Sequence, residues 1–314
     1  MQNQNVLSPS TINIINQVIA EHRLPAEFSA EVIHYYVPLA HQLYTDISAR
    51  AEADQSSGVQ FIGIQGSQGS GKSTCADFLK TLLQAQYGLR VLVASIDDFY
   101  LTLREREKLA ESVHPLLITR GVPGTHDVSM INAMFDCAER GESFAVPNFS
   151  KAEDDRAPIA QWQQVEGALD VVILEGWCVG LSAQDNTKLR MPINQMEMNE
   201  DVSGQWRALI NHHLETGYCT LFARLDHLVA LQAPSFECVF EWRLLQEQKM
   251  IALLSEQDLD VSGAQTPAQL KRFIAHYQRL TEHALESMPT QADYLLWLNK
   301  NHGFVKLERV CHDA

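Results

Sequence analysis

The sequence predicts an α/β protein with a central parallel sheet of about five strands and helices on both faces. Two observations support this prediction. Short apolar runs, typical of strands buried on both faces, alternate with longer helical patterns, and the first run leads into a glycine-rich turn. Strands that alternate with helices form a parallel sheet through right-handed crossovers. The predicted strands lie at 59–64, 91–96, 171–174, 228–231 and 294–298.

Two segments extend this sheet-and-helix pattern, and we expect all of residues 1–314 to form one domain. Apolar residues recur at helical spacing before the first strand, so residues 1–57 are expected to form an N-terminal helical extension, interrupted or kinked at Pro38. Residues 99–168 separate the second and third strands and are expected to form an insertion on the substrate side of the sheet.

A complete GxxxxGKS motif directly follows the first predicted strand and precedes a helical pattern. Its glycines let successive amide N–H groups point at phosphate oxygens, and the start of the helix adds its positive dipole end. Lys72 is expected to reach the β- and γ-phosphates, and Ser73 to offer its hydroxyl to Mg²⁺. The motif predicts a P-loop NTPase with the three-layer fold of the NMP-kinase type. The predicted nucleotide site comprises Gly66, Ser67, Gln68, Gly69, Ser70, Gly71, Lys72, Ser73 and Thr74.

The second predicted strand ends at Asp97 and Asp98, so at least one carboxylate emerges at its carboxyl end. Ligands of open α/β sheets bind at this edge. A carboxylate there can accept the proton of an attacking hydroxyl during phosphoryl transfer. The alternative is that one of these aspartates caps the next helix.

The third predicted strand runs into Glu175, Gly176 and Trp177. Four apolar residues followed by an acid are typical of a Walker-B strand, whose carboxylate holds Mg²⁺ directly or through water. The alternative is a buried glutamate paired with a basic residue. Asp97, Lys72 and Glu175 are therefore the predicted catalytic residues, and Ser73 and Glu175 the predicted metal ligands.

The overall charge and the cysteines exclude several function classes. With 24 basic and 39 acidic residues the chain has a net charge of -15, which does not favour binding to nucleic acid or to anionic lipid. The six cysteines contain no CxxC pair, which argues against a zinc ribbon or a disulfide framework. Neither a secretory signal nor an apolar run of membrane-spanning length is found, so we expect a cytoplasmic protein with no nucleic-acid or membrane partner.

Several motifs resemble those of one kinase family. SIDDFY at 95–100, RGVPGTHD at 120–127, DRAP at 155–158 with Trp162, and LEGW at 174–177 are similar to the plant-type D-glycerate 3-kinases. That family lies within the uridine kinase, pantothenate kinase and phosphoribulokinase group of P-loop kinases. The similarity runs from about Tyr36 to Leu298 and so covers most of the chain.

The resemblance implies ATP- and Mg²⁺-dependent phosphoryl transfer to the hydroxyl of a small hydroxy acid, with D-glycerate giving 3-phosphoglycerate as the leading candidate. It implies that Asp97 is the catalytic base and that Glu175 lies near the metal. Arg120 suits an acceptor that carries a carboxylate, since a guanidinium can bind it through two hydrogen bonds; the alternative is an arginine that anchors a loop. The segments expected to face the acceptor carry Asp98, Tyr100, Arg120, His126, Lys151 and Arg156.

A further cation, Arg243, lies in a predicted helix that resembles the lid of this group, where positive charge covers the transferring phosphate. The alternative is an arginine on the helix surface.

The chain departs from the family pattern at 147–156. The family usually carries PxFDKS followed by GxGDR, whereas this segment reads PNFSKAEDDR, which keeps Lys151 and Arg156 but replaces the first aspartate by Ser150 and lacks both glycines. The departure concerns acceptor specificity more than phosphoryl transfer. Other functions left open are a kinase for another small hydroxy metabolite, such as uridine or pantothenate, a nucleotide-binding regulatory protein, and an NTPase in which water attacks.

Overall fold

The structure is a computed structural model that describes residues 7–54, 58–256 and 266–311. Residues 1–6 and 55–57 of the predicted N-terminal extension lie outside the described residues. The α-helices are α1 (Pro9–Glu21), α2 (Phe28–Glu31), α3 (Val37–Asp54), α4 (Lys72–Tyr87), α5 (Leu103–Ser112), α6 (Val128–Glu139), α7 (Gln195–Glu200), α8 (Gln205–His213), α9 (Cys219–Phe222), α10 (Phe236–Glu256) and α11 (Pro267–Gln291). Short 3₁₀ helices are η2 (Ile96–Phe99), η3 (Pro115–Ile118), η4 (Ile159–Gln161) and η5 (Asn186–Leu189), and π-helical turns are η1 (Val32–Tyr36) and η6 (Leu214–Tyr218).

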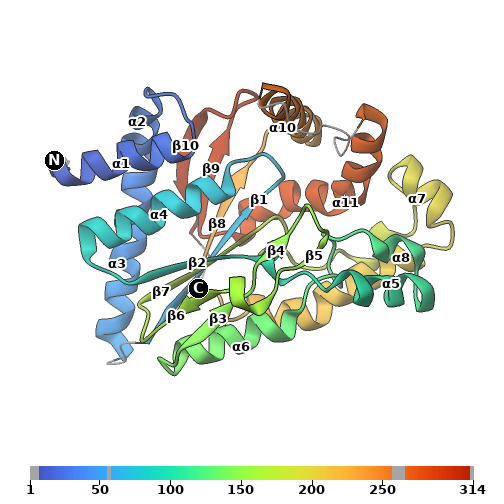
Figure 1. Cartoon of the computed structure of the whole chain (residues 1–314), viewed down its shortest axis with the longest axis horizontal. Helices are drawn as coiled ribbons and strands as arrows, with labels where there is room; N and C mark the ends of the chain where they lie inside the picture. Colours follow the sequence, from blue (N-terminus) through green and yellow to red (C-terminus); the bar gives the residue numbers. More distant parts are fainter. Residues whose placement is uncertain (1–6, 55–57, 257–265, 312–314) are drawn as a thin grey trace.

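The main sheet has six strands in the order β10-β9-β8-β1-β7-β2 (Figure 1). The five parallel strands are the five that the apolar runs predict, so the predicted α/β fold is confirmed. The sixth, β10, pairs with β9 in the antiparallel direction and was not predicted. The strands are β1 (Gln60–Gly66), β2 (Val91–Ser95), β7 (Val171–Gly176), β8 (His227–Gln232), β9 (Tyr294–Leu298) and β10 (Phe304–Arg309).

Alternate residues of the central strands face two different cores. In β7, Val172 and Leu174 pack with helices α6, α8 and α11, whereas Val171 and Ile173 pack with α1, α3 and α4. Because side chains alternate across a strand, the strands supply the middle layer between two layers of helices. The predicted three-layer arrangement is therefore present.

The predicted interruption at Pro38 takes the form of a change in helix type. The π-helical turn η1 ends at Tyr36, and Pro38 is the second residue of α3. Proline has no N–H to donate, and the chain stays helical through Val37, so the helix changes from π to α geometry beside Pro38 without ending.

The segment between β2 and β7 holds two small hairpins beside α5 and α6 (Figure 1). In the first, β3 (Phe144–Val146) pairs with β6 (Gln163–Val165), and in the second, β4 (Phe149–Ser150) pairs with β5 (Asp155–Arg156). These short strands bring residues 149–156 to the carboxyl end of β2, where the Asp98 carboxylate accepts a hydrogen bond from the Phe149 amide at 3.2 Å.

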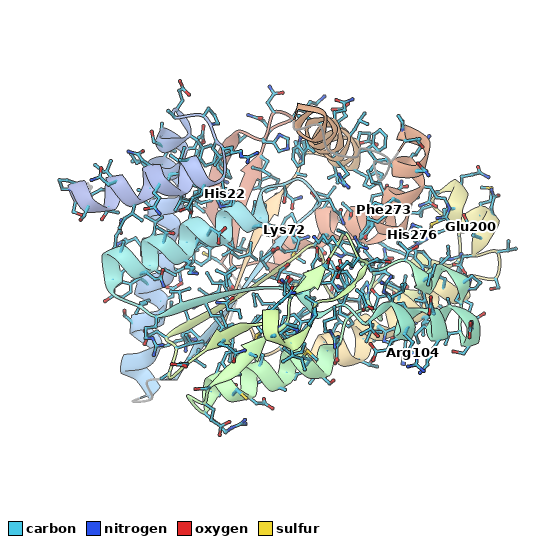
Figure 2. All side chains as sticks on the ribbon, viewed as in Figure 1. His22, Lys72, Arg104, Glu200, Phe273 and His276 are labelled. Carbon is cyan, nitrogen blue, oxygen red and sulfur yellow. The ribbon has the colours of Figure 1, made fainter. Side chains whose placement is uncertain are left out.

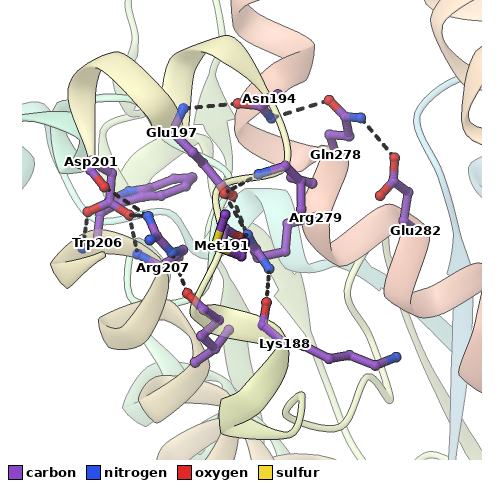
Figure 3. Close-up of polar contacts among 12 residues, drawn as sticks. Lys188, Met191, Asn194, Glu197, Asp201, Trp206, Arg207, Gln278, Arg279 and Glu282 are labelled. Carbon is purple, nitrogen blue, oxygen red and sulfur yellow. Dashed lines mark hydrogen bonds and ion pairs between the residues drawn. The ribbon is translucent and has the colours of Figure 1, made fainter. Parts of the chain in front are cut away.

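Two buried ion pairs fasten the segment before α8 (Figure 3). Arg279 of α11 donates to both carboxylate oxygens of Glu197, at 2.8 and 2.6 Å, and Arg207 pairs with Asp201 at 2.8 Å. Both carboxylates are fully buried, and each arginine also donates to main-chain carbonyl groups, which compensates for its loss of water. This network fixes α11, whose other face reaches the site described below.

Among the residues that the structure describes, none of the helices combines the length and the apolar character needed to span a lipid bilayer.

Candidate active site

The P-loop has the backbone that its glycines permit. Gly69 and Gly71 adopt φ values of +79° and +89°, and a Cβ at Gly66 would lie 2.4 Å from the Ser70 hydroxyl. The Ser67 and Ser70 hydroxyl groups are buried and have no hydrogen-bond partner within the described part of the chain. Unpaired polar groups at the start of α4 fit a loop that binds phosphate.

The strand order brings the P-loop and both acidic strand ends together. β1 lies beside β7, and β7 lies beside β2, with Glu175 opposite Ile64 on one side and Ser95 on the other. The Ser73 hydroxyl donates to Glu175 Oε1 at 2.9 Å, whereas Glu175 Oε2 is buried without a partner among the described residues. A hydroxyl and a carboxylate oxygen with a free lone pair are hard ligands that suit Mg²⁺.

One cavity of about 490 Å³ joins these groups to the predicted acceptor side. Lys72 at the start of α4 and Phe273 of α11 line it from different elements (Figure 2). Most of the remaining lining is polar or charged, as expected for a site that handles anions. The cavity is lined by Gln68, Gly69, Lys72, Ser73, Ser95, Asp97, Tyr100, Arg120, Lys151, Glu175, Trp177, Arg243, Phe273 and Tyr277.

Both oxygens of the Asp97 carboxylate are hydrogen bonded. The Tyr100 hydroxyl donates to Oδ1 at 2.7 Å, and Lys151 Nζ donates to Oδ2 at 2.8 Å. Burial alone would raise the pKa of Asp97, but the charges of Lys151 and Lys72 and these two hydrogen bonds lower the pKa to about 2. Asp97 is therefore a carboxylate throughout the physiological pH range.

Two of the cations predicted to face the acceptor form ion pairs with carboxylates of the protein itself. Lys151 is held by Asp97, and Arg120 forms an ion pair with Asp154. The Arg120 guanidinium also lies 5.4 Å from the centre of the Phe149 ring, within the range of a cation–π contact. Arg243 of α10 contributes a third cation to the wall of the cavity.

Asp98, His126 and Arg156 do not line the cavity; they lie behind its wall. The His126 ring stacks on Tyr100 at 4.7 Å, and Arg156 donates to the Tyr100 carbonyl at 2.8 Å. Burial lowers the pKa of His126 to about 4, so its ring is neutral, and burial raises the pKa of Asp98 to about 6. These residues hold Tyr100 and the hairpin at 149–156 in place.

Four residues of the wall were not predicted as site residues: Ser95, Trp177, Phe273 and Tyr277. Trp177 donates from Nε1 to the Gly121 carbonyl at 2.8 Å and also faces the cavity. Tyr277 donates to the Arg120 carbonyl at 3.0 Å, and Phe273 lies one helical turn before it. Of these four, Ser95 and Trp177 have a signal in the sequence, because each lies next to a predicted strand end that carries a candidate acid.

A second cavity, of about 650 Å³, lies on the other side of the P-loop. Thr74 lines this cavity and not the first one. Aromatic residues of the α2 helix, of α10 and of the β9–β10 hairpin face it, with Trp242 and His302 in ring contact at 4.3 Å. Gly69 lines both cavities, so the two are neighbours across the P-loop.

The fold and this site define a P-loop kinase, in which a P-loop and two acidic strand ends meet at the edge of a parallel sheet. No family model matches the chain. The chain is 33% identical to the uncharacterized kinase mug58 of Schizosaccharomyces pombe over 69% of its own length and 77% of the relative. It is 30% identical to the probable ATP-dependent kinase TDA10 of Saccharomyces cerevisiae, over 80% of the chain and 88% of the relative.

Two named D-glycerate 3-kinases are also similar. The chloroplastic enzyme of Arabidopsis thaliana is 25% identical over 87% of the chain, which spans 59% of that protein. The solved structure of the Cryptococcus neoformans enzyme has a TM-score of 0.68 and 27% identity and covers 87% of this chain and 99% of its own. The chain therefore belongs to the D-glycerate 3-kinase family of P-loop kinases, and it is a phosphotransferase that acts on an alcohol group.

Proposed function

We propose that the protein transfers the γ-phosphoryl group of ATP to D-glycerate and forms 3-phosphoglycerate. One observation carries the proposal: the Asp97 carboxylate lies in the same cavity as the P-loop lysine and two acceptor-side cations, Lys151 and Arg120. The similarity to the two D-glycerate 3-kinases supports the choice of acceptor.

ATP would lie across the P-loop and enter both cavities. The P-loop amides and Lys72 would bind its phosphates, and Arg243 from α10 would cover the transferring group. The larger cavity beside Thr74 has the aromatic lining that suits a nucleotide base, with Phe28, Trp242 and Phe304 in its walls.

Ser73 and Glu175 would hold Mg²⁺. The unpaired Glu175 Oε2 is the observation that fits an ion here, because a buried carboxylate oxygen without a donor is costly. When bound, the ion supplies positive charge that neutralises the phosphate oxygens during transfer. The hydrogen bond from Ser73 orients Glu175 toward the phosphate side of the cavity.

Asp97 would act as the base. As the acceptor oxygen attacks the γ-phosphorus, the bond from that phosphorus to the ADP oxygen breaks, and the hydroxyl proton passes to the Asp97 carboxylate. Tyr100 keeps the carboxylate oriented through Oδ1. Arg120 and Lys151 would bind the carboxylate of the acceptor, while Asp98, His126 and Arg156 support the wall that carries these groups.

The test is Mg²⁺-dependent ADP release by the purified protein with D-glycerate, L-glycerate, pantothenate, uridine or ribulose 5-phosphate, beside a control without acceptor. We expect the protein to release ADP with D-glycerate. We expect the Asp97→Asn variant to lose this activity while it still binds ATP with the same affinity. A response only to another acceptor would identify a kinase for that metabolite. ATP binding without turnover across the panel would indicate a regulatory nucleotide-binding protein, and release without acceptor an NTPase.

A further inference from the structure

Asp154 has a backbone conformation that glycine ordinarily adopts. Its φ is +53°, in the left-handed region, where a side chain crowds the backbone. In the pattern GxGDR, aligned on Asp155 and Arg156, a glycine stands at this position. The chain thus carries a carboxylate where the pattern has no side chain.

A fully buried arginine holds Asp154 in this conformation. Arg106, with 0% of its surface exposed, donates from Nη2 to the Asp154 carbonyl at 2.6 Å and lies 3.0 Å from the Asp154 carboxylate. It also donates to the carbonyls of Leu101 and Ile118, at 3.3 and 2.7 Å. Since a buried guanidinium needs such partners, Arg106 ties together the three segments that carry Tyr100, Arg120 and Lys151.

The Asp154 carboxylate contacts both the buried Arg106 and Arg120, a residue of the cavity wall. Its Oδ1 forms an ion pair with Arg120 Nη1, and Arg120 lines the cavity. A guanidinium has five N–H donors, so this contact leaves others for a carboxylate ligand. The Tyr277 hydroxyl also donates to the Arg120 carbonyl, at 3.0 Å, and so holds the Arg120 backbone.

We propose that Asp154 and Arg106 are positioning residues that aim the Arg120 guanidinium at the carboxylate of the acceptor. This inference rests on the proposed function for the nature of the acceptor, and it assigns a role to the departure of this chain from the family pattern. Neither residue touches the reacting atoms; both act through Arg120.

The first experiment compares Asp154→Asn with Glu153→Gln. Asparagine tolerates a left-handed backbone, so Asp154→Asn removes only the charge. Glu153 is an exposed acid next to Asp154, and Glu153→Gln is therefore the matched control. We expect Asp154→Asn to raise the KM for D-glycerate by about tenfold or more while the KM for ATP stays unchanged. We expect Glu153→Gln to change neither. An unchanged or lowered acceptor KM in Asp154→Asn would overturn the proposal.

A double variant tests whether Asp154 acts through Arg120. Asp154→Asn in an Arg120→Met background should add no further loss, because the group that Asp154 aims is gone. Additive losses would contradict this. Arg106→Lys should raise the acceptor KM as Asp154→Asn does, whereas Arg104→Lys, an exposed arginine on the same helix (Figure 2), should not.

A measurement without any acceptor separates this inference from the proposed function. Phenylglyoxal modifies accessible arginines, and mass spectrometry gives the rate at Arg120. We expect faster modification of Arg120 in Asp154→Asn than in the wild-type protein and in Glu153→Gln. Equal rates would overturn the inference even if D-glycerate is phosphorylated; faster modification in a protein that does not phosphorylate D-glycerate would overturn only the choice of acceptor.

Discussion

Lys151 donates to the carboxylate of Asp97 at 2.8 Å, so an exposed cation on a short hairpin occupies one oxygen of the half-buried base. The other oxygen accepts a hydrogen bond from Tyr100, which is itself buried and stacked on the ring of His126. Of the two donors, Lys151 is the one that solvent can reach and that a ligand can recruit, because 63% of its side chain is exposed. An acceptor carboxylate that binds Lys151 would free an oxygen of Asp97 for the hydroxyl proton.

Lys151→Met is expected to make the reaction sensitive to acid. Burial raises the pKa of Asp97, and the charge of Lys151 is the largest effect that lowers it. Without that charge the pKa of Asp97 rises, so kcat/KM for the acceptor should begin to fall at a higher pH, as the pH is lowered, than it does in the wild-type protein. The wild-type rate, with the pKa of Asp97 at about 2, should show no such loss from this group. The measurement is a pH profile of both proteins, with the exposed Lys108→Met on α5 as control; parallel profiles would contradict the prediction.

Glu175→Gln is expected to raise the Mg²⁺ concentration for half-maximal activity by about tenfold, as the loss of a group that holds or orients a metal usually does. The amide can still accept the hydrogen bond from Ser73, so the P-loop should keep its shape. Titration with Mg²⁺ at saturating ATP measures the effect, and binding of ATP in the presence of EDTA is the control. Equal Mg²⁺ dependence in both proteins would argue against a metal at Glu175.

Asp98→Asn is expected to stabilise the protein at pH 8. Burial raises the pKa of Asp98 to about 6, above its ordinary value of 3.8, so folding takes up a proton between these values. The stability from this group is complete below pH 3.8 and is lost as the pH rises through 6. An amide carries no charge to desolvate and still accepts from the Phe149 amide, so we expect the Tm at pH 8 to rise by roughly 2–4 °C. The gain should shrink at pH 5; a gain that is equal at both pH values would contradict the assignment.

Glu197→Gln is expected to destabilise the fold by about 3 kcal/mol, because it leaves the buried Arg279 guanidinium without its counter-charge. The matched control is Glu200→Gln. Glu200 pairs with Arg272 on the same two helices but at the surface, so its loss should cost less than about 1 kcal/mol. Urea unfolding of the three proteins measures the difference. A similar loss of unfolding free energy in the two variants would show that burial does not make the Glu197–Arg279 pair contribute more than the surface pair.

The sequence predicts the parallel sheet well because its signal is local. A strand buried on both faces carries a nearly continuous apolar run, and β1, β2, β7, β8 and β9 each contain such a run of four or five residues, with polar residues only at the strand ends or beside them. The edge strand β10 reads FVKLER, is half exposed and carries charges, so no buried run marks it. The hairpins of β3 to β6 have strands of two or three residues, too short for a periodic pattern.

The residues of the candidate site also fall into those that the sequence predicts and those that it does not. Lys72, Asp97 and Glu175 each follow a predicted strand, and the sheet order alone brings them to one edge. Tyr277 and Asp154 come from a long helix and a tight turn, and their placement depends on tertiary packing and on the buried Arg106. No spacing in the sequence encodes such contacts between distant segments.

The cavity beside Thr74 is walled by residues from Leu24 to Phe304, which is nearly the whole span of the chain. During synthesis the P-loop leaves the ribosome early, but the hairpin that closes this cavity follows more than two hundred residues later. The pocket for the nucleotide therefore stays incomplete until the β9–β10 hairpin, which also supplies the last two strands of the sheet, has been synthesised, and only from then on can ATP bound there stabilise the protein.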